Sequence, residues 1–289
     1  MLMPTTVYAV GVPIMLSLIF IEAMASARKS LGFYELGDTG GTIGLLFGNI
    51  LTSVAIQSTT LGFSFYLYHF RLFTLNEVLA PWQVWAITFV VIDFIFYWYH
   101  RASHRVRILW AIHMNHHSSI EMNFSVAFRQ AWFGPISKVP FFLVMPLVGF
   151  DPSITVVAAI CSRFWGVAGH TQWIGKLGWL DRIFNTPSTH RVHHGTNLEY
   201  IDRNYGNLFI IWDRLFGTYA KEQAPVAFGL VKNLNTNNPF KITFHTWVAM
   251  ARDIQQAQSF YEIIGYIFGP PDWLPRRKMT ASNKSQIFE

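Results

Sequence analysis

The sequence predicts an all-α integral membrane protein, with about four to five transmembrane helices followed by a cytoplasmic helical cap. Of its 289 residues, 52% are hydrophobic and only 13% are charged, and the aromatic residues include 26 Phe and 11 Trp. Charged residues normally make up about a quarter of a soluble domain. The chain stays apolar up to about residue 170 and then becomes more polar. We therefore expect one membrane-embedded domain over 1–275, with membrane helices to about 170 and the cap over 171–275.

Four apolar runs approach the roughly 20 residues that a transmembrane helix needs. They cover residues 7–27, 42–70, 85–99 and 134–169. The second is long enough to tilt or break. The fourth is long enough for two passes, and Asp151-Pro152-Ser153 in its middle predicts a hairpin turn. A cleaved signal peptide is the alternative for the first run, but no basic region precedes it, so we expect a retained helix.

The basic residues predict which way the helices face, because short loops rich in Lys and Arg stay in the cytoplasm. If the N-terminus is outside, the turn at Asp151 and the loop containing Arg71 are outside too, and together they carry a single basic residue. The residues from 176 onward lie inside, as do Arg28, Lys29, Arg101, Arg105, Arg107 and Arg129. We expect the polar cap, and any site it contains, on the cytoplasmic side.

Cysteine content and charge exclude several other classes of protein. A single cysteine, Cys161, rules out internal disulfides and a cysteine-built metal site. The net charge of +6 fits the topology and contact with anionic lipids. No helix-turn-helix, RNA-binding or finger pattern accompanies it, so we expect no nucleic-acid partner. Residues 276–289 are polar and predict a disordered tail.

Nine of the eleven histidines fall between positions 100 and 194, and eight of them form three tight groups. The groups are "HRASH" (His100, His104), "HMNHH" (His113, His116, His117) and "HRVHH" (His190, His193, His194). Spacings of three and four place side chains on one side of a helix. Adjacent histidines diverge by roughly 100°, which suits ligands of two neighbouring metal ions better than of one. His170 closes the last apolar run and is expected on the same membrane face.

The number and type of these ligands favour a pair of redox metals. One zinc site uses three or four ligands, so nine imidazoles predict two ions. Imidazole suits Zn, Cu, Fe and Ni alike, so ligand type alone does not select the metal. No HExxH, GxSxG or Walker motif is present. Two irons beside an apolar, lipid-facing cavity are suited to activating O2. A zinc hydrolase and a metal transporter remain as non-redox alternatives.

The three histidine groups resemble the histidine boxes of the fatty acid hydroxylase / sterol desaturase superfamily of membrane di-iron enzymes. With "DFIFYWYHRASH", "WAIHMNHHSS", "NTPSTHRVHHGTN" and "YGNLFIIWDRLFGTY", the chain is most similar to its alkylglycerol-monooxygenase-like branch. The resemblance runs from about residue 93 to 219. It implies two iron ions, held by the eight box histidines and by His170, which matches an extra histidine between the second and third boxes.

The resemblance also implies an activity and its partners. The implied activity is O2-dependent C–H hydroxylation of a membrane lipid, such as an ether lipid, a fatty acyl chain or a sterol. Desaturation by the same centre is the alternative. No haem, flavin or iron–sulfur pattern is present, so electrons must come from a reductase or a reduced pterin. The branch implies tetrahydrobiopterin. Relatives often carry two acids after "HHSS"; here Ile120 replaces the first and only Glu121 remains.

Several polar residues are candidates for holding the ligands or lining the substrate space. Asp93 lies seven residues before His100, nearly two helical turns away on its face, and an acid inside the bilayer is costly without a partner. Further candidates are Glu121, Asn123 and Asn197, with Asp202, Tyr205 and Asp213 as weaker ones that surface salt bridges or turns would equally explain. His69 and His245 lie outside the boxes and are expected at the surface.

Overall fold

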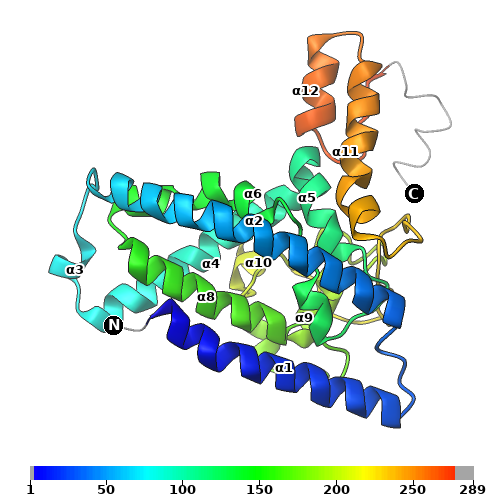
Figure 1. Cartoon of the computed structure of the whole chain (residues 1–289), viewed down its shortest axis with the longest axis horizontal. Helices are drawn as coiled ribbons and strands as arrows, with labels where there is room; N and C mark the ends of the chain where they lie inside the picture. The colour runs from blue at the N-terminus through cyan, green and yellow to red at the C-terminus, as the bar shows by residue number, and fades with distance from the viewer. Residues whose placement is uncertain (1–2, 277–289) are drawn as a thin grey trace.

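The chain is all-helical in its computed structural model, which describes residues 3–276. Three helices are long and apolar enough to cross a membrane: α1 (Pro4–Arg28), α2 (Leu36–Tyr68) and α4 (Pro81–Arg105). Figure 1 shows α1, α2 and the shorter α8 (Pro152–Ala168) lying along one another. The predicted first, second and third runs therefore correspond to three continuous helices, and the second is not broken.

The fourth apolar run folds back on itself but does not form two long helices. It consists of α6 (Gly134–Phe142), α7 (Val144–Val148) and α8, and both halves are shorter than 18 residues. Pro140 lies inside α6, where a proline removes a backbone hydrogen bond. Asp151 caps α8, because its carboxylate accepts from Ser153 N at 2.7 Å. At 1.5 Å per residue, α8 is only about 26 Å long.

Close contacts between the helices depend on small residues. A Cβ placed on Gly11 would lie 2.3 Å from the ring of Phe164, so α1 approaches α8 at a glycine. Gly48 of α2 similarly leaves room for the Trp132 ring. Ile92, Met145, Phe150 and Ala158 form a buried cluster where α4, α7 and α8 meet. The helices are thus packed together at the core, while their outer faces carry exposed apolar side chains.

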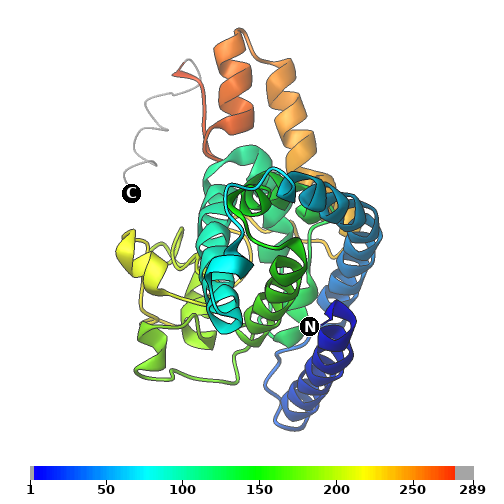
Figure 2. The ribbon, with the colours of Figure 1, turned by 90° about the vertical axis from the view of Figure 1, so that its left-hand side faces the viewer.

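The remaining elements are short and lie around one end of the long helices. They are α5 (Arg107–His117), η1 (Phe124–Phe128), η2 (Leu180–Arg182), α9 (Pro187–His193) and α10 (Ile211–Leu215), while α3 (Leu75–Val78) lies at the opposite end. Two isolated antiparallel bridges, Phe184–Phe209 and Gly195–Phe228, join the loops. Figure 2 shows the yellow segment with α10 on the side of the bundle opposite α2.

Two final helices form a hairpin that projects from the bundle. They are α11 (Pro239–Gln255), capped by Asn238, and α12 (Phe260–Phe268), capped by Ser259. Figures 1 and 2 show the hairpin pointing away from the bundle, across the direction of the long helices. The last turn of α11 is tied to the start of α5 by the Arg107–Asp253 ion pair at 2.6 Å, and Arg107 N donates to Gly269 O, just after α12, at 2.9 Å. The predicted tail 276–289 lies, apart from Arg276, outside the described residues.

Candidate metal centre

The first two histidine boxes lie on consecutive helices that meet at a sharp bend. His100 and His104 are in the last two turns of α4, and His113, His116 and His117 are in α5. Val106 between the helices is extended, with φ −120° and ψ 118°. The bend turns α5 back against α4, and it brings His113 within 2.9 Å of His100, measured between their Nε2 atoms.

The third box lies on α9, a short helix whose start is fixed by its own sequence. Pro187 occupies the first turn, and Thr186 N donates to Thr189 Oγ1 at 2.8 Å. Every residue of α9 is buried. His190 and His193 lie in the helix and His194 is its C-cap residue, so all three imidazoles project within one turn. A seven-residue helix therefore presents a complete box.

The nine histidines form two adjoining groups. Five make the first, His100, His104, His113, His117 and His193, and four make the second, His116, His170, His190 and His194. Within each group the available ligand atoms all lie within 4.8 Å of one another. The chain therefore gathers all nine expected histidines, drawn from α4, α5, α9 and the loop after α8. His69 and His245 are exposed and belong to neither group.

Each of the two triplet boxes is divided between the groups. In "HMNHH", His113 and His117 enter the five-histidine group and His116 enters the other. In "HRVHH" the division is reversed, since the pair four residues apart, His190 and His194, enters the four-histidine group. The angle between successive helical side chains produces this division. The helices α5 and α9 thus each contribute histidines to both groups.

The spacing of the nitrogens tests whether a metal ion fits. Nε2 of His113 lies 3.1 Å from Nε2 of His117, and Nε2 of His170 lies 3.0 Å from Nε2 of His190. Metal–imidazole bonds of about 2.1 Å place two ligands at right angles roughly 3 Å apart. Nε2 atoms of His104, His193 and His194 are buried and have no hydrogen-bond partner among the described residues. Buried polar atoms rarely stay unpaired, so the arrangement fits two bound ions.

The outer nitrogens of several histidines are held by backbone carbonyls. Nδ1 of His100 contacts Tyr205 O at 2.7 Å, Nδ1 of His170 contacts Gly166 O at 2.8 Å, and Nδ1 of His193 contacts Arg203 O at 3.0 Å. Such a bond places the proton on Nδ1 and leaves Nε2 free for a metal. His190 Nδ1 lies 3.3 Å from the side-chain nitrogen of Asn185.

Burial also favours the neutral imidazole, which is the form that binds metal. It lowers the pKa of His170 to about 4, and the pKa of His190, His193 and His194 is lowered well below 6.5 by burial and by neighbouring histidines. The same causes act on the three histidines of α5. At neutral pH these side chains therefore present unprotonated nitrogens.

Asp213 and Asp93 act on the histidines indirectly, through the loop that follows Tyr205. Asp213 accepts from Tyr205 N at 2.7 Å and Gly206 N at 2.8 Å, and so fixes the residue whose carbonyl holds His100. Asp93, inside α4, accepts from Leu208 N, Phe209 N and the Trp212 indole at 2.7 to 3.0 Å. Asp93 has no hydrogen bond to a histidine among the described residues; it ties this loop to α4.

Asp202 lies beside the five-histidine group. Its carboxylate is 3.7 Å from His104 Nδ1 and 2.5 Å from Arg105 Nη1. Burial raises the pKa of Asp202, but the contacts with His104 and Arg105 outweigh this effect and bring the pKa to about 2. Asp202 and Asn204 have positive φ angles of 59° and 56°, which Asp and Asn tolerate better than most residues. The turn that approaches His104 thus depends on this local sequence.

The other sequence candidates lie elsewhere. Asn197 bonds Ala227 N and Pro225 O and so fixes a loop. Asn123 caps η1 and donates to Phe33 O at 2.6 Å. Glu121 is half-buried next to the acids of α2, and its pKa is raised, first by burial and then by Asp38 and Glu35. No hydrogen bond joins these three side chains to a histidine among the described residues.

Two buried acids near the centre were missed by the sequence analysis. Glu22 of α1 accepts from Tyr34 Oη and Phe124 N and is bonded by Thr171, the residue after His170. Asp38 of α2 pairs with the fully buried Arg129 at 3.1 Å. Each acid connects a long helix to the loops that carry histidines. An acid within an apolar run was the signal that could have found Glu22.

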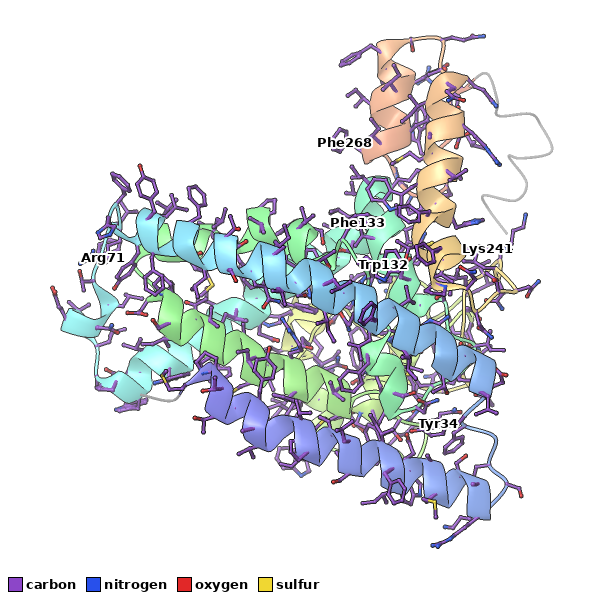
Figure 3. The ribbon with its side chains drawn as sticks, in the orientation of Figure 1. Tyr34, Arg71, Trp132, Phe133, Lys241 and Phe268 are labelled. Atoms are coloured by element: carbon purple, nitrogen blue, oxygen red, sulfur yellow. The ribbon has the colours of Figure 1, made fainter. Side chains whose placement is uncertain are left out.

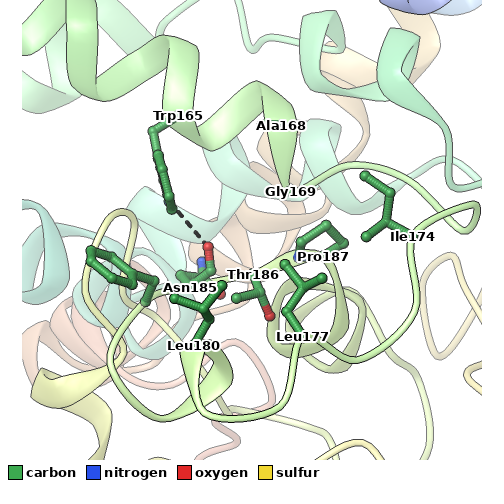
Figure 4. A pocket seen from close by; sticks show the side chains of 10 residues that line it. Trp165, Ala168, Gly169, Ile174, Leu177, Leu180, Asn185, Thr186 and Pro187 are labelled. Carbon is green, nitrogen blue, oxygen red and sulfur yellow. Dashed lines mark hydrogen bonds between the residues drawn. The ribbon is translucent and has the colours of Figure 1, made fainter.

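An apolar cavity of about 250 Å³ borders the four-histidine group (Figure 4). It lies between the end of α8 and the loop before α9, and Trp165 closes one side by donating its indole N–H to Asn185 O at 3.1 Å. Gly169, which also lines it, packs directly on His190, since a Cβ there would lie 3.1 Å from the ring. Gly169 thus lies between this apolar space and His190 of the centre.

Comparison with known proteins identifies the class. The fatty acid hydroxylase family profile matches residues 85–218, the segment that carries all nine clustered histidines. No solved structure matches the chain. Residues 85–218 therefore belong to the fatty acid hydroxylase family, and over most of its length the chain is similar to alkylglycerol monooxygenases.

Individual relatives support that placement. Alkylglycerol monooxygenase from Homo sapiens is 35% identical over 91% of this chain and 59% of its own length. An ornithine lipid hydroxylase from Rhizobium tropici is 30% identical over 47% of this chain and 41% of its own. A Delta(7)-sterol 5(6)-desaturase from Gibberella zeae is 27% identical over 43% and 37%. The chain thus spans little more than half of the human relative.

Proposed function

We propose that the chain is an integral membrane oxidoreductase that uses two irons and O2 to hydroxylate a membrane lipid. The observation that carries this proposal is the pair of adjoining histidine groups, whose neutral, buried nitrogens lie at the spacing of metal ligands. Imidazole ligands suit iron as well as zinc. The names of the relatives favour iron-dependent oxidation over the zinc hydrolase and the metal transporter.

The protein's part in the reaction is to hold the metal ions, to orient their imidazole ligands and to enclose the centre. Irons bound by the two groups would supply the redox chemistry that O2 requires. The carbonyls of Tyr205, Gly166 and Arg203 fix the orientation of three imidazoles through their Nδ1 atoms. The burial of α9 excludes water from one side of the centre.

The substrate is proposed to reach the centre from the bilayer. The groups lie at the ends of α4 and α8, and the cavity near Trp165 is lined mainly by apolar residues. We place this end, with residues 171–275 as a cap, on the cytoplasmic side, because Arg28, Lys29 and Arg105 lie there. On that topology, α6–α7 and α8 enter the bilayer as a shorter hairpin beside the three long spans.

An ether lipid is the substrate class that we favour, because the relatives with the longest matches are alkylglycerol monooxygenases. The atom balance is that of a monooxygenase: one oxygen atom of O2 enters the C–H bond, and the other leaves as water after taking up two protons, with two electrons from an external donor. A reduced pterin such as tetrahydrobiopterin, or a reductase, is the proposed donor. Desaturation is the second candidate, favoured by the sterol desaturase match.

The test combines metal analysis with isotope labelling of purified chain in lipid. We expect about two irons per chain, and label from ¹⁸O₂ in an alcohol or its breakdown product once an ether lipid and a reduced donor are added. His194→Ala should lower product formation by roughly a hundredfold. His245→Ala is the matched control, since His245 is exposed on α11 and lies outside both groups.

Four results would contradict the proposal. Two zinc ions with O2-independent cleavage of a lipid would indicate a hydrolase, and metal uptake into vesicles without lipid oxidation would indicate a transporter. An alkene formed only with O2, without label in the lipid, would assign the centre to desaturation. Loss of activity in His245→Ala equal to that in His194→Ala would show that the histidine groups have no special role.

A further inference from the structure

The α11–α12 hairpin carries an exposed apolar face that the proposed reaction does not use. On α11, Phe240, Phe244 and Val248 recur every four residues and are 40 to 63% exposed. On α12, Phe260, Ile264 and Phe268 recur at the same spacing and are 39 to 75% exposed. A spacing of four aligns side chains along one face of a helix. Each helix therefore presents an apolar stripe that the described residues leave partly exposed.

The charged residues of the hairpin are distributed differently. Lys241, His245 and Arg252 are exposed, and their spacings of four and seven place them together on a neighbouring face of α11. The acids are already engaged, since Asp253 pairs with Arg107 and Glu262 accepts from Gln258 N. The exposed charge of the hairpin is thus positive. An apolar stripe bordered by basic residues is the pattern of a helix that lies in a membrane interface.

The direction of the hairpin fits a membrane surface. It points away from the bundle, across the direction of α1, α2 and α8, so it runs along the surface of a membrane that these helices cross (Figure 1). In Figure 3, Phe268 lies on the side toward which α6 extends, and Lys241 lies on the opposite side. With α6 inside the bilayer, the apolar side of the hairpin faces the lipid and the basic side faces water.

The height of the hairpin along α2 also matches a bilayer surface. α2 has 33 residues and is about 50 Å long, whereas the hydrocarbon core is about 30 Å thick. Apart from Leu36 in its first turn, the exposed large apolar side chains of α2 begin at Ile43 and Phe47. The hairpin joins α2 just there, because a Cβ on Gly44 would lie 2.7 Å from the Pro239 ring. The start of α11 is therefore level with the point at which α2 leaves the lipid.

The side chains that line the angle between the hairpin and the bundle are apolar as well. Phe133 lies 6.1 Å from Phe244 and 5.8 Å from Trp247, measured between ring centroids, and Figure 3 shows Trp132 and Phe133 in this angle. An apolar hollow of about 360 Å³ extends from there over Ile108, Ile112 and Ile136. The apolar surface of the hairpin thus continues through this hollow onto α5 and α6.

We propose that the α11–α12 hairpin is an interfacial anchor, which lies in the plane of the membrane and binds a leaflet that contains anionic lipids. Its phenylalanines and Ile264 enter the acyl region, and Lys241 and Arg252 contact phosphate headgroups. The proposal rests on the membrane-spanning role of the long helices and not on the metal chemistry. It can therefore fail while the proposed oxidation stands, and the reverse also holds.

The test uses the full chain in nanodiscs that hold one chain each. A Cys161→Ser background carries one fluorescent label, at Ile264→Cys or, as the matched control, at His245→Cys. We expect lipids brominated near the headgroup end of the acyl chain to quench the label at 264 and not the label at 245. Iodide in the water should quench position 264 roughly threefold less than position 245. Replacing neutral lipid by phosphatidylglycerol should increase lipid quenching at 264. This increase should disappear in the double variant Lys241→Gln, Arg252→Gln.

Each other outcome overturns the proposal. Equal iodide quenching at the two positions would place both faces of the hairpin in water. Protection of position 264 without quenching by brominated lipid would show that protein covers the face. Protection that appears only when two chains share a disc would identify a second copy as the occupant. Unchanged dependence on phosphatidylglycerol in the double variant would remove the anionic-lipid part.

Discussion

The two histidine groups differ in what stands behind them. The five-histidine group is supported mainly by the loop over residues 202–213, through the carbonyls of Tyr205 and Arg203 and the carboxylate of Asp202. The four-histidine group is supported by the end of α8, since Gly166 O of that helix holds His170. Glu22 of α1 also fixes this side through Thr171. One group thus depends on loop structure and the other on the helix bundle.

This difference shows how two similar ligand sets can tolerate damage unequally. If each ion takes four histidine ligands, as a tetrahedral site does, the five-histidine group has one ligand to spare and the four-histidine group has none. The supporting contacts differ in the opposite sense. The five-histidine group is supported by a loop, and loops open more easily than the packed helices behind the four-histidine group. We therefore expect loss of a ligand to harm the four-histidine group more, and loss of a supporting contact to harm the five-histidine group more.

The largest effect is expected from removing one ligand from each group. His170→Ala should leave about one tightly bound metal per chain and lower activity at least roughly a hundredfold. His104→Ala should retain nearly two metals, because four imidazoles remain around its ion. Metal content after dialysis against a mild chelator measures the difference. Equal metal loss in the two variants would show that the groups are not independent in this way.

An intermediate effect is expected from Asp213→Asn. The carboxylate accepts from two backbone N–H groups and from Thr218, and an amide would face Tyr205 N or Gly206 N with an N–H group of its own. The Tyr205 carbonyl would shift, and the metal affinity of the five-histidine group should fall by 10- to 100-fold, the range typical of such supporting contacts.

The same substitution in a His170→Ala background reports the five-histidine group alone. Its metal affinity can then be measured by competition with a chelator of known strength. Affinity within twofold of the His170→Ala parent would mean that Asp213 stabilises the loop without orienting His100.

The smallest effect is expected from Asp202→Asn. Its carboxylate is partly exposed and lies 3.7 Å from His104 Nδ1, longer than a hydrogen bond. We expect affinity to fall only a few-fold, and the loss to be smaller at high salt because exposed charges are screened. The readout is the same competition assay at two salt concentrations. A loss as large as that of Asp213→Asn would show that His104 depends on this acid as closely as His100 depends on Tyr205.

The convergence of the histidines was predictable because helical spacing is a local property. Spacings of three and four in "HMNHH" and "HRVHH" already implied two directions per box, and the division of each box between the groups follows from them. The long helices were predictable for a similar reason, since uninterrupted apolar length is visible in the sequence. The break of the fourth apolar run into α6, α7 and α8 was less predictable, although Pro140 and Pro146 lie in that run.

The supporting contacts were not predictable, because they join residues that are distant in the sequence. Asp93 was singled out for its seven-residue distance from His100, yet its partners are residues 208–212, more than a hundred positions away. Asn197 was singled out for its place after "HHGT" and instead bonds residues 225 and 227. Loop conformation decides such pairings, and turns with positive φ at Asp202 and Asn204 are not visible as periodicity.

The contact between Glu22 and Thr171 has a consequence for biogenesis. The two residues are 149 positions apart, so the first helix is synthesised and inserted long before its partner leaves the ribosome. Until then the acid stays in or near the lipid without its final partners, which is costly for a carboxyl group. The first helix should therefore remain loosely placed, or shielded by the insertion machinery or a chaperone, while translation proceeds. Its final docking would mark the point at which the nascent chain becomes able to load metal.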